Sequence, residues 1–273
     1  MNLSPLDPKI FLSIVIPAHN EEKSLPITVQ AIADHFKEKA VFDFEILVIN
    51  DNSSDGTEAV LKELEASIPY LRHVNNAPPN GFGQALKKGI HEFRGEALCF
   101  VMADLSDSPQ DIYAYYTELK RGAECVFGSR FIAGSKVLDY PFIKLVLNRL
   151  ANTFVQYLFW LPHNDMTNAF KAYRREVIEG LFPILSCHFN ITVELPLKAI
   201  VRGYSFHTIP ISWTNRVHGI SKLKIKEMGS RYLFIVLYVW LEKYLSRGDY
   251  LRKRSQNKNQ IRSLPPHSKT PAA

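Results

Sequence analysis

Two acidic loops, each following a short apolar run, constrain the fold more than any other feature of the sequence. The run 44–49 leads into Asn50-Asp51-Asn52-Ser53-Ser54-Asp55-Gly56-Thr57, and the run 97–103 leads into Asp104-Leu105-Ser106-Asp107. In open α/β sheets, ligands bind in the crevice outside the carboxyl ends of the strands. Carboxylate and hydroxyl oxygens are ligands that suit Mg²⁺ or Mn²⁺. We therefore expect a nucleotide and a divalent cation at one edge of a sheet.

Apolar runs alternate with helical patterns through the first half of the chain. The runs typical of strands are 11–16, 44–49, 70–74, 97–103 and 124–128, and the helical patterns are 21–38, 57–67, 80–93 and a segment that starts near Pro109. This alternation predicts an α/β domain with a doubly wound, mostly parallel sheet.

The pattern changes after residue 130. Two aromatic-rich apolar stretches, 141–160 and 232–245, are flanked by Lys or Arg, which is typical of helices that lie in a membrane interface. The first is interrupted by polar side chains, and the uncharged run of the second is shorter than the roughly 20 residues that span a bilayer. We expect amphipathic, interfacial helices. The alternatives are helices packed on the catalytic domain, or a dimer face.

The net charge of +6 is concentrated near the end of the chain. The residues from 247 onward include Arg247, Arg252, Lys253, Arg254, Lys258, Arg262 and Lys269 against a single Asp249. Such a segment either contacts an anionic membrane surface or is a solvated end. Because these residues are not interleaved with aromatic residues on a sheet, we expect no nucleic-acid binding.

Several motifs, taken in order, resemble those of inverting GT-A-fold glycosyltransferases of family 2. More narrowly, they resemble those of the dolichol-phosphate and polyprenyl-phosphate mannosyltransferases. The motifs are Pro17-Ala18-His19-Asn20-Glu21, the 50–57 loop, Asn80-Gly81-Phe82-Gly83-Gln84-Ala85, Asp104-Leu105-Ser106, Gly128-Ser129-Arg130, Asp165-Met166-Thr167-Asn168-Ala169-Phe170-Lys171 and Gly219-Ile220-Ser221-Lys222. The resemblance implies transfer of a hexose from a nucleotide diphosphate sugar to a polyprenyl phosphate, with inversion and with a divalent metal.

The resemblance also implies the residues that bind the donor. These are Pro17, His19, Glu21, Asp51, Ala103, Asp104, Arg130, Arg216 and Lys222. GDP-mannose is the favoured donor, and a UDP-sugar is the alternative. His19 replaces a Tyr of the family, and it either stacks on a base or is an ordinary loop histidine. Glu21 is either a ribose or base acceptor or a carboxylate in the first turn of a helix, and we expect Asp55 to order its loop.

The resemblance places catalysis on Asp104 and Arg130, and the metal on Asp104 with Ser106 or Asp107. The family reads Asp-Ala-Asp-Leu-Gln where this chain reads Met102-Ala103-Asp104-Leu105-Ser106. Loss of the first carboxylate predicts weaker binding of Mg²⁺ or Mn²⁺, or a different donor preference. An acceptor phosphate is already an anion, so catalysis should act by positioning and by neutralising the leaving group.

The start of the first apolar stretch carries Lys144, Asn148 and Arg149. The family has polar and basic residues near this place that meet the lipid phosphate, so we expect these residues to bind the acceptor phosphate. The alternative is a solvated helix face.

The expected organisation is an N-terminal extension (1–10), a glycosyltransferase domain (11–228) that includes the apolar acceptor helix (about 141–160), an apolar interfacial helix (229–246) and a basic tail (247–273). Because no basic segment precedes a long apolar run at the N-terminus, we expect no signal peptide. We expect peripheral association with the cytoplasmic face of a membrane, with or without a membrane partner subunit. Two other functions stay open, namely transfer from a UDP-sugar to a saccharide in surface polysaccharide synthesis, and a catalytically impaired nucleotide-sugar-binding subunit, which the Met102 replacement favours.

Overall fold

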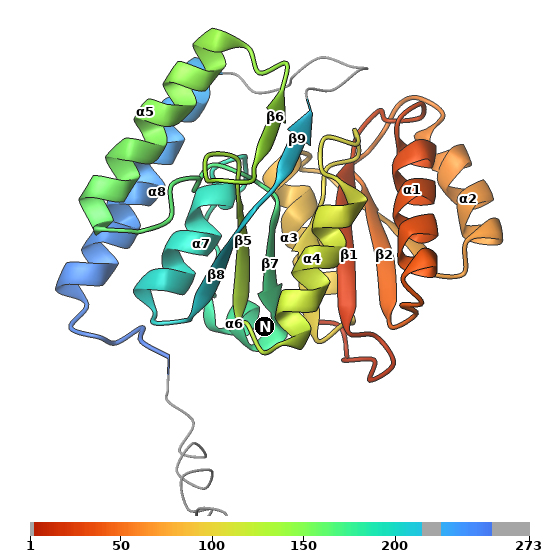
Figure 1. Cartoon of the computed structure of the whole chain (residues 1–273), viewed down its shortest axis with the longest axis horizontal. Coiled ribbons are helices and arrows are strands. Elements are labelled where there is room, and N and C mark those ends of the chain that lie inside the picture. The colour runs from red at the N-terminus through yellow and green to blue at the C-terminus, as the bar shows by residue number, and fades with distance from the viewer. Residues whose placement is uncertain (1–2, 215–224, 253–273) are drawn as a thin grey trace, which may run out of the picture.

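A mixed sheet forms the centre of the protein. The computed structural model describes residues 3–214 and 225–252, with the backbone alone for 225–228. The sheet order is β3-β2-β1-β4-β7-β5-β8 (Figure 1). The strands are β1 (Leu12–Ala18), β2 (Phe44–Asn50), β3 (Leu71–Asn75), β4 (Ala97–Phe100), β5 (Cys125–Ser129), β7 (Lys171–Arg174) and β8 (Phe206–Pro210). All neighbours pair in parallel except β7, which is antiparallel to both β4 and β5. The predicted doubly wound, mostly parallel sheet is confirmed.

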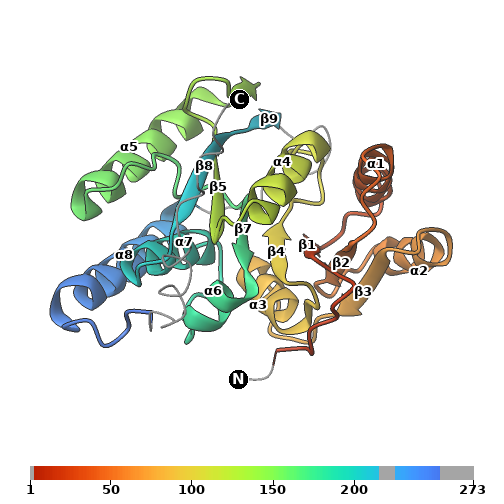
Figure 2. The same cartoon turned by 60° about the horizontal axis from the view of Figure 1, so that its bottom comes forward.

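Helices cover both faces of this sheet. One face carries α1 (Leu25–Glu38), α2 (Thr57–Ser67) and α4 (Pro109–Lys120), and the other carries α3 (Phe82–Glu92), α6 (Arg175–Gly180) and α7 (Ile191–Val201) (Figure 2). Successive residues of β1 serve opposite layers, because Ile14 packs in the first core and Val15 in the second. This burial on both faces explains why the central strands read as unbroken apolar runs.

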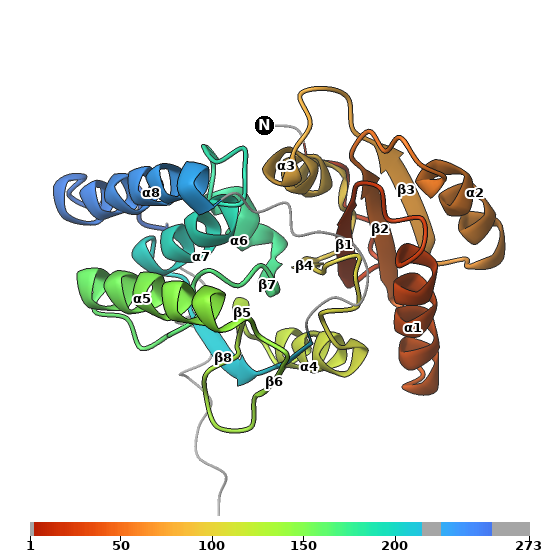
Figure 3. The same ribbon diagram turned by 90° about the horizontal axis from the view of Figure 1, so that it is seen from above.

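Two long helices, α5 (Phe142–Phe159) and α8 (Ile225–Leu245), pack beside α7 at one end of the sheet (Figure 3). They share a third apolar core with α7, to which Val155, Val193 and Ile235 contribute. The buried Arg202 guanidinium, just after α7, donates two hydrogen bonds to the Glu242 carboxylate of α8, at 2.8 and 2.9 Å. Among the described residues, no helix is both long enough and apolar enough to cross a bilayer.

Some boundaries differ from the predicted ones. The first helix begins at Leu25, with a proline in its first turn, and not at Glu21. The strands β7 and β8 were not predicted, and neither was the small sheet of β6 (Lys136–Leu138) and β9 (Ser212–Thr214). These strands are short and contain polar residues such as Lys171 and His207, so they lack the apolar runs on which the prediction depended.

Candidate active site

The loops after β1, β2 and β4 lie at the same edge of the sheet. β1 pairs in parallel with β2 on one side and with β4 on the other. The carboxyl ends of these three strands therefore lie together (Figure 3). Both acidic loops extend from this edge, as the sequence predicted.

Asp51 orders the loops at this edge of the sheet. One of its carboxylate oxygens accepts a hydrogen bond from Asn76 Nδ2 and the other from Gly81 N–H, both at 2.8 Å. The backbone oxygen of Asp51 lies 2.7 Å from His19 Nδ1. The side chain is buried, so Asp51 joins the loop after β2 to the loop that begins α3. If this carboxylate also accepted a hydrogen bond from a bound nucleotide, it would do so through its remaining lone pairs.

Glu21 lies in the loop before α1. Its carboxylate accepts a hydrogen bond from Ser24 Oγ at 2.6 Å, and its backbone N–H donates to Thr57 Oγ1 at 2.9 Å. Because α1 begins only at Leu25, the alternative of a carboxylate in the first helical turn is wrong. Asp55 accepts hydrogen bonds from the backbone N–H groups of Thr57 and Glu22, at 3.0 and 3.3 Å. Its predicted role in ordering the loop is confirmed.

Two other donor candidates contribute backbone to the same edge. Pro17 is half-buried near the end of β1, opposite Ile49 of β2. The buried Ala103 carbonyl accepts a hydrogen bond from Thr28 Oγ1 of α1 at 2.8 Å. Both residues therefore shape the edge through the position of the main chain.

The loop after β4 carries two aspartates in different surroundings. Asp104 is half-buried, and its Oδ1 accepts a hydrogen bond from Ser106 N–H at 3.2 Å. Asp107 is 3% exposed and accepts a hydrogen bond from Met102 N–H at 2.9 Å. Burial raises the pKa of Asp107 to about 7, although the bond from Met102 opposes the shift. Asp104 is the more accessible carboxylate, whereas Asp107 supports the loop from within.

This loop fits a divalent cation that takes most of its ligands from substrate. No group of three or more His, Cys, Asp or Glu side chains among residues 3–214 and 229–252 is arranged to hold a metal on its own. Mg²⁺ is commonly held by one or two carboxylates together with substrate phosphates and water. Asp104, with Ser106 or Asp107 nearby, could supply that protein share.

Arg130 follows β5 and is held by Asp165. Its Nε and Nη2 donate to the two oxygens of the Asp165 carboxylate, at 2.8 and 2.7 Å, and its backbone N–H donates to the same group at 3.0 Å. Both side chains are buried. Burial alone would raise the pKa of Asp165, but the guanidinium lowers it, and the net shift is downward. The remaining nitrogen, Nη1, lies 3.4 Å from the hydroxyl of Tyr140, a residue that also lines the groove described next.

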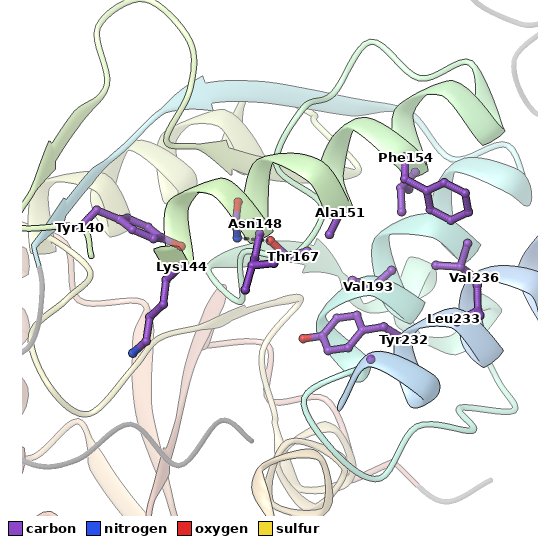
Figure 4. Close-up of a pocket in the computed structure, with 13 residues that line it drawn as sticks. Tyr140, Lys144, Asn148, Ala151, Phe154, Thr167, Val193, Tyr232, Leu233 and Val236 are labelled. Carbon is purple, nitrogen blue, oxygen red and sulfur yellow. Dashed lines mark hydrogen bonds between the residues drawn. The ribbon is translucent and has the colours of Figure 1, made fainter. Parts of the chain in front are cut away.

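An apolar groove of 340 Å³ lies between α5 and α8 (Figure 4). Its polar end is formed by Tyr140, Lys144, Asn148 and Thr167, and its apolar part by Leu147, Ala151, Phe154, Val155, Val193, Tyr232, Leu233 and Val236 with Gly229. Asn148 Nδ2 donates to Thr167 Oγ1 at 2.7 Å. One end of the groove therefore offers an ammonium and an amide, and the rest offers hydrocarbon.

Not every predicted residue lines this groove. Lys144 and Asn148 do, but Arg149 turns away, because its Nη1 donates to the Asn164 carbonyl at 3.2 Å and its guanidinium lies over the Phe131 ring. Tyr140 and Tyr232 were missed, since no local pattern marks residues that only the packing of α5 against α8 brings together. Arg216, Lys222 and the tail beyond residue 252 lie outside the described residues.

Comparison with known proteins supplies the context for this geometry. A family model described as glycosyl transferase family 2 matches residues 13–182. The chain is 33% identical over 216 residues to a polyprenol monophosphomannose synthase of Mycolicibacterium smegmatis, which covers 77% of this chain and 80% of that protein. It is 28% identical over 221 residues to a dolichol-phosphate mannosyltransferase of Pyrococcus furiosus, which covers 79% of this chain but 60% of that longer relative.

A solved structure shares the fold. Glucosyl-3-phosphoglycerate synthase from Mycobacterium tuberculosis, in complex with Mn²⁺, UDP and phosphoglyceric acid, superposes with a TM-score of 0.63. The superposition covers 86% of this chain and 78% of that one, at 17% sequence identity. This likeness shows the architecture alone, whereas the family match and the 33% identical polyprenol monophosphomannose synthase define the class of enzyme. The chain belongs to glycosyltransferase family 2 and is a glycosyltransferase.

Proposed function

We propose that this enzyme transfers a hexose from a nucleotide diphosphate sugar to a polyprenyl phosphate. The observation that carries the proposal is the groove between α5 and α8, which combines a long apolar wall with a polar end at Lys144 and Asn148. A polyprenyl phosphate has the same division into a hydrocarbon chain and an anionic head. The names of the two relatives, a polyprenol monophosphomannose synthase and a dolichol-phosphate mannosyltransferase, favour this acceptor and a mannose donor.

The donor nucleotide is proposed to bind at the edge formed by the loops after β1, β2 and β4. Pro17, His19, Glu21, Asp51 and Ala103 are its proposed neighbours, and Arg216 and Lys222 are proposed to neutralise the diphosphate. GDP-mannose is the proposed donor, with a UDP-sugar as the alternative. The hydrogen-bonded order of these loops supports a preformed site, which lowers the entropy lost on binding.

Transfer is proposed to be a single displacement with inversion. An oxygen of the acceptor phosphate attacks the anomeric carbon, the bond from that carbon to the donor diphosphate breaks, and the nucleoside diphosphate leaves. No side chain needs to remove a proton, because the attacking phosphate is already an anion. Mg²⁺ or Mn²⁺ at Asp104 would offset the charge on the departing diphosphate. Arg130 is proposed to lie between the two phosphates, since its Nη1 faces Tyr140 at the polar end of the groove.

The enzyme is proposed to work on the cytoplasmic face of a membrane. The outer surfaces of α5 and α8 expose large apolar side chains, among them Phe142, Tyr157, Trp160, Phe234 and Leu245. Such residues partition into the interfacial region of a bilayer. A polyprenyl phosphate could then reach the groove from the bilayer.

The decisive test is transfer by the purified protein. Radiolabelled GDP-mannose or UDP-glucose is incubated with polyprenyl phosphate in liposomes, with Mn²⁺ or with EDTA, and label is measured in the lipid extract. Metal-dependent labelling from GDP-mannose is expected. Labelling only of added oligosaccharide would overturn the lipid acceptor, and no transfer despite donor binding would favour an impaired enzyme. If transfer begins only when a membrane extract is added, a partner subunit is required.

A further inference from the structure

The segment 165–171 links the two halves of the site. Asp165 at its start holds Arg130, and Thr167 holds Asn148 in the groove. Lys171 at its end is the first residue of β7 and pairs with Phe127 of β5. Because β7 is antiparallel to β5, the segment that enters β7 lies beside the residues that leave β5.

On one side, the segment fixes Arg130 through three hydrogen bonds to a single carboxylate. Asp165 receives the backbone N–H, Nε and Nη2 of Arg130, and its side chain has no exposed surface. Two parallel bonds from a guanidinium to a carboxylate fix the plane of both groups. The position of Asp165 therefore decides where the remaining Arg130 nitrogen points.

On the other side, the segment fixes the polar end of the groove. Thr167 Oγ1 accepts hydrogen bonds from Asn148 Nδ2 at 2.7 Å and from Asn152 Nδ2 at 3.1 Å. The Thr167 backbone N–H donates to Asn152 Oδ1 at 3.2 Å. These bonds tie the segment to α5. The position of Thr167 therefore decides how the Asn148 amide lies in the groove.

Lys171 holds the turn between these two contacts. Its ammonium donates to the carbonyl oxygens of Met166, at 3.0 Å, and of Asn168, which flank Thr167. The side chain is 1% exposed. Burial lowers the pKa of Lys171 to about 7, while the nearby Asp165 opposes the shift. Burying an amine is costly unless its hydrogen bonds are made, and here they are made to the backbone of this one turn.

We propose that Lys171 is a positioning residue that holds the 165–168 turn so that Arg130 and Asn148 face one reaction centre. The inference rests on the proposed function for the identity of the two substrates. If Lys171 holds both residues, replacing this one buried side chain, which touches neither substrate, raises KM for the donor and for the acceptor alike. A residue that served only the donor or only the acceptor would change one Michaelis constant.

The test compares Lys171→Met with a matched control, Lys198→Met. Lys198 is also a fully buried lysine, but it binds Glu194 and the Pro183 carbonyl. In Lys171→Met, KM should rise about tenfold or more for both donor and acceptor, because small misplacements of binding groups are costly. In Lys198→Met, thermal stability should fall while both KM values stay unchanged. Thr167→Val should raise KM for the acceptor alone.

A second readout does not depend on turnover. The Arg130 and Thr167 amide hydrogens are bonded to Asp165 and Asn152, so their hydrogen exchange reports the position of the turn. Exchange at both amides should be faster in Lys171→Met than in the wild-type protein, and it should be unchanged at both in Lys198→Met. If Lys171→Met does not fold, Lys171→Gln replaces it. Unchanged exchange together with unchanged KM values would overturn the positioning role. A wild-type enzyme that transfers nothing to polyprenyl phosphate counts against the proposed function, and the exchange experiment then still decides the role of Lys171.

Discussion

The Asp107 carboxylate accepts a hydrogen bond from the backbone N–H of Met102 at 2.9 Å, and this bond closes the loop after β4. Met102 stands where the family has its first aspartate, yet its backbone still takes part in the loop. Leu105 adopts a left-handed backbone conformation, with φ of 58°, which turns the chain sharply between Asp104 and Asp107. The loop thus keeps an internal carboxylate as a support and presents Asp104 as the more accessible one.

Asp104→Asn should lower kcat by about 10²-fold or more, because an amide does not replace a carboxylate as a ligand for Mg²⁺ or Mn²⁺ at the leaving diphosphate. Steady-state transfer at saturating donor and metal measures the loss. Circular dichroism and the unfolding midpoint should stay close to those of the wild-type protein. Near-normal turnover would show that Asp104 is not a ligand of the metal.

The buried Asp107 should make stability depend on pH. An aspartate titrates near 3.9 in an unfolded chain, whereas the folded pKa is raised to about 7. Between roughly pH 4 and 7 the folded protein holds the extra proton, so this group's contribution to stability is lost as pH rises through that window.

Asp107→Asn carries no such proton. Its stability relative to the wild-type protein should therefore increase from pH 5 to pH 8, by up to about 3 kcal/mol. Urea unfolding at both pH values, with EDTA present, measures the difference between the two proteins. An equal difference at pH 5 and pH 8 would contradict a raised pKa for Asp107.

Lys144→Ala should raise KM for polyprenyl phosphate about tenfold, the size of a lost charge-assisted contact. KM for the donor should not change, since Lys144 lies at the groove and not at the β1–β2–β4 edge. Lys62→Ala on α2, which removes a lysine from an exposed surface pair, is the control. Equal KM values in both variants would argue against acceptor-phosphate binding at Lys144.

The sequence predicted the parts of the protein that depend on local patterns. The strands before Asp51 and Asp104 follow from apolar runs, and the loops at their ends place the candidate donor and metal residues. β7 was missed because its first residue, Lys171, is a buried cation whose partners are carbonyls, and no hydrophobic pattern marks such a residue. The groove depends on contacts between α5 and α8, and Tyr232 is more than 80 residues from Lys144 in the chain. Periodicity within each helix does not determine which faces meet.

The Arg202–Glu242 pair should anchor α8. Arg202→Met leaves the Glu242 carboxylate buried without its partner, and such a loss costs about 3–5 kcal/mol of folding stability. Denaturant unfolding measures the effect. Lys62→Met, which removes an exposed pair with Glu58, should change stability by about 0.5 kcal/mol or less. Because α8 forms one wall of the groove, Arg202→Met should also raise KM for the acceptor. An unchanged midpoint of denaturant unfolding would show that α8 is held by its apolar contacts alone.

The exposed apolar residues of α5 and α8 should bind membranes. Phe142 is 77% exposed and Trp160 is 83% exposed, at opposite ends of α5. Replacing both by serine removes two large side chains that would enter the interface, so binding to liposomes should fall about tenfold or more. Sedimentation with vesicles of anionic and of neutral lipid measures the partitioning.

Ile27→Ser provides the matched control for this double variant. Ile27 is 54% exposed on α1, on the other side of the molecule from α5 (Figure 1). Its replacement should leave vesicle binding unchanged. Donor binding should be the same in all three proteins, because none of the three replaced side chains is a proposed contact of the donor. If the two variants sediment equally with vesicles, α5 faces something other than a bilayer. A change in the oligomeric state of the double variant would then identify that surface as an interface between copies of the chain.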